Sequence, residues 1–195
     1  MGRPPANGAL MIYDDFAAIP TDHYRFIVAD PPWAYNNVRT GGSMSSGSAQ
    51  HYPVMTPDLV ADLPVRDLTA SGSVLFLWVP TPLLPDGFKV LERWGFSYRT
   101  SLYWVKRGRL GLGYWFRGNV EQCLVGIQGK VKAFRCQEPN VFYAKPRAHS
   151  QKPVEFWELV ERVTDTPRIE LFARASRDGW DSFGNEVDTH EAITS

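Results

Sequence analysis

The residues best suited to chemistry are Asp30-Pro31-Pro32-Trp33, which directly follow an apolar run at 24–29. Two consecutive prolines cannot continue a strand, because each fixes its φ angle and lacks a backbone N–H. The segment therefore offers a carboxylate, carbonyl oxygens that only accept hydrogen bonds, and a flat apolar ring. This combination favours a planar guest with an amino group, such as adenine. The simpler interpretation is a turn capped by Asp30, with Trp33 packed in the core.

The elements that position this segment are predicted from apolar runs. Residues 24–29 are apolar in their last four positions, as in a buried parallel strand, and the carboxyl ends of such strands form the ligand crevice of open α/β sheets. Further strands are predicted at 73–79, 96–106, 121–127, 140–143 and 168–173, with a short segment at 11–16 near the sheet edge. Helices are predicted at 84–94 and 154–163, and a short one begins at Thr56-Pro57-Asp58. Alternating strands and helices indicate a three-layer α/β domain with a mostly parallel sheet.

The domain organisation follows from the same pattern. We expect a flexible tail at 1–10, a single domain at 11–187 and a C-terminal tail at 188–195. Residues 34–50 are rich in Gly, Ser and Asn, and a loop of this length after the Asp30 segment favours a lid over the site.

Composition excludes several classes of protein. The 195 residues are 44% hydrophobic and 22% charged, which is typical of one soluble domain with a sizeable core. No run of 18 apolar residues predicts a membrane span, and the first ten residues lack a signal-peptide pattern. Cys123 and Cys136 have no partners at metal-ligand spacing, so we expect no metal site and an intracellular protein without disulfides.

Basic residues are balanced by acidic ones, 21 of each, so a polyanion would have to bind to a local patch. One basic group interleaves with aromatic residues: Lys106, Arg107, Arg109, Tyr114, Trp115, Phe116 and Arg117. A second group consists of Lys130, Lys132 and Arg135. Such groups suit phosphate contacts and base stacking, although a solvated loop is the preferred interpretation of either group taken singly.

Two further segments have open interpretations. Arg174 follows the last strand, and Asn185 and Glu186 come soon after; these side chains suit ribose hydroxyls, or belong to an ordinary polar tail. Before the helix at 154–163, Ser150 is a candidate cap, while Lys152 is a candidate cation for a carboxylate near the helix N-terminus.

Taken in order, these segments resemble the MT-A70 family of S-adenosylmethionine-dependent N6-adenine methyltransferases. The resemblance spans roughly Tyr13 to Glu186 and rests on six motifs: Ala29-Asp30-Pro31-Pro32-Trp33, Leu75-Phe76-Leu77-Trp78-Val79, Glu121-Gln122-Cys123-Leu124-Val125-Gly126, His149-Ser150-Gln151-Lys152-Pro153, Ile169-Glu170-Leu171-Phe172-Ala173-Arg174 and Gly184-Asn185-Glu186. It implies a Rossmann-like methyltransferase fold with a permuted motif order.

The resemblance also implies residue roles. Catalysis would fall to Asp30, Pro31, Pro32 and Trp33, with Asp30 and Pro31 holding the target amino group. The implied contacts to S-adenosylmethionine are Asp15, Phe16, Asp30, Lys152, Arg174, Asn185 and Glu186, with the register near Asp14 and Asp15 left open. The implied substrate contacts are Trp33, Tyr52, Glu121, Ser150 and Lys152. The chain departs from some relatives in having Ser176 and Arg177 where a His follows the Arg174 position.

A short member of this family suits a bacterial or phage DNA modification enzyme, so we expect adenine in DNA as the substrate and the cytoplasm of a bacterial or phage-infected cell as the location. RNA adenosine is the alternative substrate, and a non-catalytic nucleic-acid-binding scaffold is the alternative function. The expected partner is nucleic acid, with a homodimer or a helper subunit as a further possibility, and no membrane.

Overall fold

A single eight-stranded sheet organises the chain in the computed structural model, which describes residues 10–34, 54–108, 111, 115–132, 134, 137–146 and 151–184. The strands are β1 (Ile12–Tyr13), β2 (Tyr24–Ala29), β3 (Thr69–Val79), β4 (Ser97–Lys106), β5 (Val120–Gln128), β6 (Val141–Ala144), β7 (Arg168–Leu171) and β8 (Asp181–Phe183). Their order is β1-β8-β7-β2-β3-β5-β4-β6. Every neighbouring pair is parallel except the two pairs that β5 makes with β3 and β4. The sheet confirms the predicted mostly parallel, Rossmann-like α/β fold.

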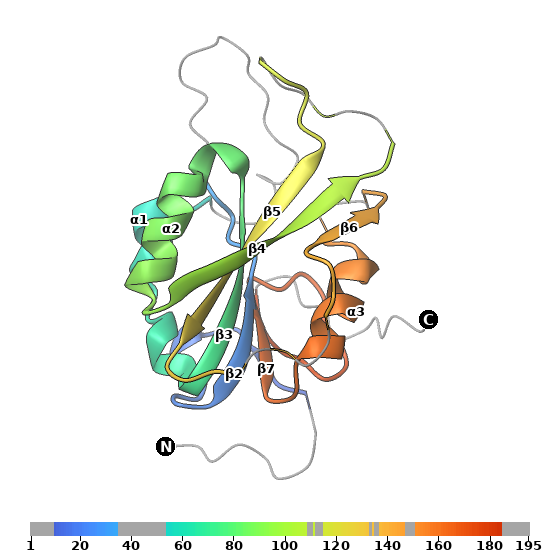
Figure 1. Cartoon of the computed structure of the whole chain (residues 1–195). Helices are drawn as coiled ribbons and strands as arrows, with labels where there is room; N and C mark the ends of the chain where they lie inside the picture. Colours follow the sequence, from blue (N-terminus) through green and yellow to red (C-terminus); the bar gives the residue numbers. More distant parts are fainter. Residues whose placement is uncertain are drawn as a thin grey trace.

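Helices cover both faces of this sheet (Figure 1). On one face, α1 (Pro57–Ala61) and α2 (Leu84–Arg93) contribute Val60 and Val90 to the same buried core as Ile27 of β2. On the other face, α3 (Val154–Val163) contributes Phe156 to the second buried core, which contains Val28, the next residue of β2. Because successive side chains of β2 enter opposite cores, the strand has to be apolar on both of its faces. This explains the continuous apolar run from which the strand was predicted.

Most element boundaries lie within a few residues of their predicted positions. The Thr56 hydroxyl accepts a hydrogen bond from the Leu59 N–H at 3.3 Å, so α1 begins with the predicted cap and N-terminal proline. Short 3₁₀ turns at Phe16–Ala18 (η1), Val65–Leu68 (η2) and Thr81–Leu83 (η3) join the longer elements.

Three details differ from the sequence prediction. β3 begins at Thr69 and not at Ser73; Gly72 lies within it at φ 83°, where a Cβ would meet the Lys130 carbonyl oxygen at 2.8 Å. β7 ends at Leu171, because Phe172 takes the left-handed conformation at φ 64°. β8 lies in the segment after Arg174, for which a polar tail was one of two open interpretations, and its three residues pair with β7 and β1.

Several predicted features fall outside the described residues: the tail at 1–10 apart from Leu10, the tail at 188–195, and the lid at 34–50 apart from Ala34. The division into one domain and two tails therefore stays a prediction. Within the described part of the chain, no helix is long and apolar enough to cross a membrane.

Candidate active site

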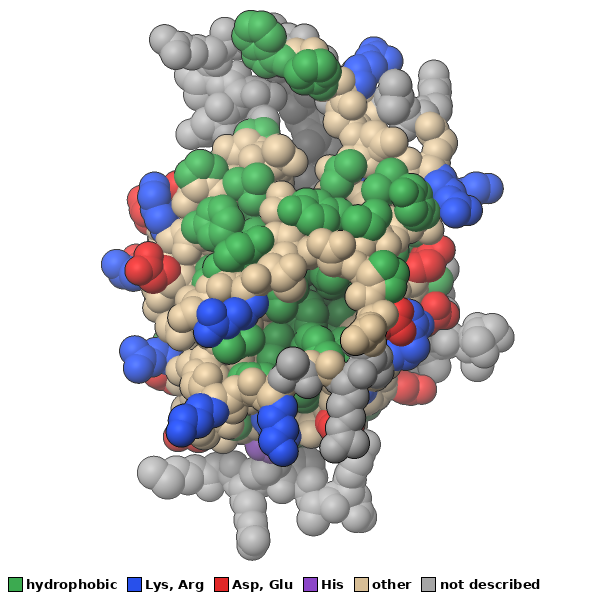
Figure 2. Space-filling view, in the orientation of Figure 1, with side chains coloured by type: hydrophobic (Ala, Val, Ile, Leu, Met, Phe, Trp, Pro, Cys, Tyr) green, Lys and Arg blue, Asp and Glu red, His purple; other side chains and the backbone are tan. Residues whose placement is uncertain are grey.

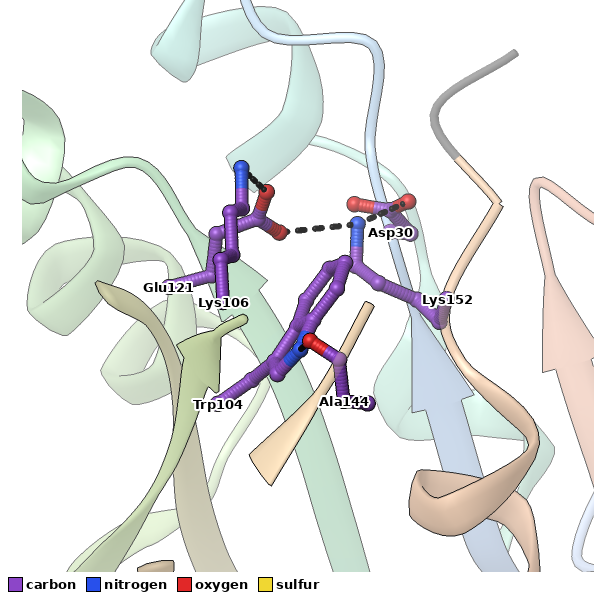
Figure 3. Close-up of polar contacts among 6 residues, drawn as sticks. All are labelled: Asp30, Trp104, Lys106, Glu121, Ala144 and Lys152. Carbon is purple, nitrogen blue, oxygen red and sulfur yellow. Dashed lines mark hydrogen bonds and ion pairs between the residues drawn. The ribbon is translucent and has the colours of Figure 1, made fainter. Parts of the chain in front are cut away.

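Four charged side chains meet at the carboxyl edge of the sheet (Figure 3). Asp30 follows the last residue of β2, and Lys106 is the last residue of β4. Glu121 lies near the start of β5, and because β5 is antiparallel its start lies at the same edge. Lys152 arrives from the segment before α3. The single reversed strand thus adds a second carboxylate to the edge that carries Asp30.

These side chains form a chain of alternating charges. The Lys152 Nζ lies 2.6 Å from Asp30 Oδ2 and 3.5 Å from Glu121 Oε2. The other oxygen of Glu121, Oε1, lies 2.6 Å from the Lys106 Nζ. Lys152 is the most buried member, with 9% of its side chain exposed, whereas the side chains of Lys106 and Glu121 are about a third exposed.

The electrostatics keep Lys152 and Glu121 ionised. Burial opposes the charge of Lys152, but the carboxylates of Asp30 and Glu121 outweigh burial and raise the pKa of the ammonium. Burial also opposes the charge of Glu121, yet Lys152 and Lys106 together lower the pKa of its carboxyl. The site therefore presents fixed positive and negative charges at neutral pH.

Aromatic rings support both lysines. The Lys152 Nζ lies 4.9 Å from the centroid of the Trp78 ring, and the Lys106 Nζ lies 5.2 Å from that of Trp104. Trp104 is itself fixed, because its indole N–H donates a hydrogen bond of 3.1 Å to the Ala144 carbonyl of β6. β6 thereby takes part in positioning a side chain of the site.

The Asp30 loop is held by backbone hydrogen bonds. The Trp33 N–H donates to the Pro31 carbonyl at 2.8 Å, and the Met55 N–H donates to the Pro32 carbonyl at 2.8 Å. A carbonyl oxygen has two lone pairs, so Pro31 keeps one for a guest. The Trp33 ring is only 9% exposed, and its indole N–H donates to the Trp78 carbonyl at 2.9 Å. Trp33 therefore anchors the loop to β3, and its stacking on a base stays a prediction.

A hollow opens beside Asp30 on the α3 side of the sheet. Its lining residues are Asp30, Gln151, Lys152, Trp157, Glu170, Phe172, Arg174, Ala175, Ser176 and Arg177. Burial raises the pKa of Glu170 to about 8, although Arg177 acts in the opposite direction. The hollow combines two carboxyls with several cations and two aromatic rings.

Of the predicted cofactor contacts, Asp30, Lys152 and Arg174 line this hollow. Asp15 and Phe16 do not: the Asp15 carboxylate accepts a hydrogen bond from the Ala17 N–H at the start of η1. Phe16 is linked to the hollow through rings, since it packs on Phe183 at 5.1 Å and Phe183 packs on the lining residue Phe172 at 6.3 Å. Tyr52, Ser150, Asn185 and Glu186 lie outside the described residues. Pro153 occupies the N-cap of α3, so the interpretation of Ser150 as the cap is wrong.

Sequence reasoning missed Lys106 as a member of the ion-pair chain and Glu170 as a lining residue. Glu170 was detectable, because Ile169 and Leu171 belong to one core and the residue between them must face the opposite side of the sheet. One residue of each basic group can be placed relative to β5: Lys106 lies beside its start, and Lys130 lies beyond its end. Lys130 therefore lies at the far edge of the sheet from Asp30.

Comparisons with known proteins identify a matching family and its relatives. The family model described as MT-A70 matches residues 24–186. The Arabidopsis thaliana protein named N(6)-adenosine-methyltransferase MT-A70-like is 32% identical over 171 residues, which cover 83% of this chain and 23% of that protein. The Homo sapiens N(6)-adenosine-methyltransferase catalytic subunit METTL3 is 30% identical over 176 residues, 85% of this chain and 28% of that protein.

A third relative differs in extent. The type II methyltransferase M.MunI from a Mycoplasma species is 27% identical over 194 residues, which cover 88% of this chain and 81% of that protein. This chain therefore spans about a quarter of the plant and human relatives but most of M.MunI.

Proposed function

Because the chain belongs to the MT-A70 family, we propose that it is an enzyme that transfers a methyl group from S-adenosylmethionine to the N6 amino group of adenine in DNA. The observation that carries the proposal is the ion pair between Asp30 and Lys152, because both residues line the hollow and Asp30 directly precedes Pro31-Pro32. The choice of DNA follows the type II methyltransferase M.MunI, which this chain matches over most of the length of both proteins.

The lining of the hollow fits S-adenosylmethionine. The amino-acid end of S-adenosylmethionine carries an ammonium, which needs a carboxylate such as Asp30. It also carries a carboxylate, which needs a cation such as Lys152 or Arg174. Glu170 lines the same hollow and can accept hydrogen bonds from ribose hydroxyls, while Phe172 and Trp157 provide apolar surface for the adenosine. When bound, S-adenosylmethionine supplies an electrophilic methyl group on its sulfonium.

The chain's own residues would make the adenine amino group reactive by orienting it. The Asp30 carboxylate accepts a hydrogen bond from one N–H and the Pro31 carbonyl from the other, which favours a pyramidal nitrogen with an available lone pair. Lys152, at 2.6 Å from Asp30, fixes the orientation of that carboxylate. No strong base is needed, because the amino proton leaves after the nitrogen has been alkylated. In duplex DNA the target base first has to leave the stack.

RNA is the second candidate substrate, because the plant and human relatives are named N(6)-adenosine-methyltransferases. The human relative is named a catalytic subunit, which supports the further proposal that this chain acts with a second copy or a helper subunit.

Radiolabelled S-adenosylmethionine incubated with duplex DNA, single-stranded DNA, RNA or no nucleic acid tests this function, with digestion of the products to locate N6-methyladenine. We expect label in DNA adenine, and a loss of about a thousandfold in turnover for Asp30→Ala. Asp62→Ala is the matched control, because Asp62 makes an exposed ion pair with Arg93 away from the site and its loss should leave turnover unchanged. Label in RNA alone would show that RNA and not DNA is the substrate. If the protein neither transferred label nor bound the cofactor, the non-catalytic scaffold would be the better interpretation. Near-normal turnover of Asp30→Ala would refute the role of this residue.

A further inference from the structure

The loop between β4 and β5 carries two aromatic side chains almost wholly in solvent. Trp115 is 94% exposed and Phe116 is 91% exposed. Figure 2 shows hydrophobic side chains projecting at the top of the molecule beside a Lys or Arg side chain, in the region where Figure 1 places this loop. Neighbouring exposed rings of this size are costly in water and mark a surface that contacts a partner.

Backbone hydrogen bonds join the two ends of this loop, so the position of the segment that carries the rings is defined. The Lys106 N–H donates to the Asn119 carbonyl at 2.8 Å, and the Gly111 N–H donates to the Gly118 carbonyl at 2.9 Å. A Cβ on Gly111 would lie 2.5 Å from that Gly118 oxygen, so this close pairing depends on glycine. Trp115 and Phe116 lie in the sequence between the paired residues Gly111 and Gly118.

The charge of the segment identifies the kind of partner. Residues 106–119 include Lys106, Arg107, Arg109 and Arg117 and no acidic residue, in a chain whose net charge is zero. The Arg107 guanidinium lies 5.6 Å from the ring centroid of Tyr143, which is itself 54% exposed. An apolar protein partner would not explain why all the charged residues beside the rings are positive. A nucleic acid explains both features, because its phosphates attract the cations and its bases stack on the rings.

The position of the loop links it to the site. Lys106, the residue at its base, contacts Glu121, and Glu121 contacts Lys152, the partner of Asp30. The loop thus leaves the sheet at the edge where Asp30 lies. A nucleic-acid strand that placed its target adenine at Asp30 would therefore pass close to Lys106, where the loop begins.

We propose that the tip formed by Trp115, Phe116 and Arg117, together with Arg107, is a nucleic-acid contact that stacks on unpaired bases beside the target and binds their phosphates. The proximity of a target base rests on the proposed function. Stacking and phosphate contact have different signatures, because stacking depends on aromatic character and phosphate contact depends on salt.

Fluorescence anisotropy of a labelled single-stranded DNA of about 20 nucleotides, without cofactor, separates the two contributions. For the double variant Trp115→Ala, Phe116→Ala we expect the Kd to rise about tenfold per ring, with an unchanged salt slope. Replacing both rings by Tyr should restore binding, whereas replacing both by Leu should not. The double variant Arg107→Ala, Arg117→Ala should reduce the slope of log K against log salt by about 1.4, since each phosphate contact to a single strand contributes about 0.7.

The matched control is Lys130→Ala, Lys132→Ala, because these exposed lysines lie at the opposite end of β5, and its Kd should equal that of the wild type. Wild-type affinity of the Ala or the Leu ring variant would overturn stacking. A ring variant that changes a wild-type dimer into a monomer in sedimentation, with its DNA affinity unchanged, would assign the tip to a second copy and overturn the proposal. Because binding is measured without turnover, a wild-type protein that binds DNA through this tip but methylates nothing would refute the proposed function alone.

Discussion

The substitution Lys106→Met tests whether the ion-pair chain positions Asp30. Met preserves an aliphatic stem over the Trp104 ring and removes only the charge that lies 2.6 Å from Glu121. Glu121 would then be free to approach Lys152, now 3.5 Å away, and would compete with Asp30 for its ammonium. We therefore expect Lys106 to act on the reaction through Glu121, as a positioning residue.

The magnitude follows from distance and exposure. Unit charges 2.6 Å apart attract by about 1.6 kcal/mol in water and about 6 kcal/mol at an effective dielectric constant of 20. Fully exposed pairs contribute about 0.2–1 kcal/mol. Both of these side chains are only about a third exposed, so we place their coupling slightly above that range, at about 1–1.5 kcal/mol. Transmission of this amount to the transition state lowers kcat by about five- to tenfold.

The assay is a double-mutant cycle on methyl transfer at saturating cofactor, with Lys106→Met, Glu121→Gln and the double variant. We expect the Lys106→Met loss to disappear in the Glu121→Gln background, and Lys106→Arg to retain most of the wild-type kcat. Lys89→Met, which breaks the exposed pair with Asp86, is the control and should have no effect. An equal loss from Lys106→Met in both backgrounds would refute the reasoning, because Lys106 would then act on the substrate directly.

Two further predictions concern the buried groups around Asp30. The pKa of Glu170 is raised to about 8, so the folded chain retains a proton that the unfolded chain releases near pH 4.5; the stabilisation from the neutral acid is complete below pH 4.5 and is lost as the pH rises to 8. Urea unfolding at pH 5, 6, 7 and 8 should therefore show Glu170→Gln losing less stability over this range than the wild type, and parallel curves would contradict the raised pKa. Trp33→Phe should cost about 1–3 kcal/mol of unfolding free energy, because the Trp78 carbonyl loses its donor, and chemical denaturation at pH 7 measures it. An unchanged unfolding midpoint would show that this hydrogen bond does not hold the Asp30 loop.

The sheet was predictable where burial on both faces leaves a continuous apolar run, as in β2 and in the second half of β3. It was less predictable where pairing and not burial defines the strand. β8 has three residues and a polar start at Asp181, whose carboxylate accepts hydrogen bonds from the Met11 N–H and the Tyr24 hydroxyl. A sequence pattern does not reveal such a strand, because its partners lie far away in the chain.

The site shows the same limit. Asp30 and Lys152 were identified from motifs that stand out in the sequence, and the structure joins them in an ion pair. Lys106 was assigned only to a basic loop, because its role depends on β5 running antiparallel and bringing Glu121 to the same edge. Strand direction is a property of the whole sheet, so local residue types could not supply it.

The hydrogen bonds around Pro32 have a consequence for how this molecule can change. The Ala34 N–H donates to the Met55 carbonyl at 2.8 Å, and the Met55 N–H donates to Pro32, so the chain that leaves the site at Ala34 returns to the same place. The ends of this segment are thus joined independently of what lies between them. Since doubling the length of a closed loop costs only about 0.6 kcal/mol in entropy, insertions and deletions between these residues should hardly affect the loop that holds Asp30. Changes in length and composition there should therefore leave the Asp30 carboxylate in place.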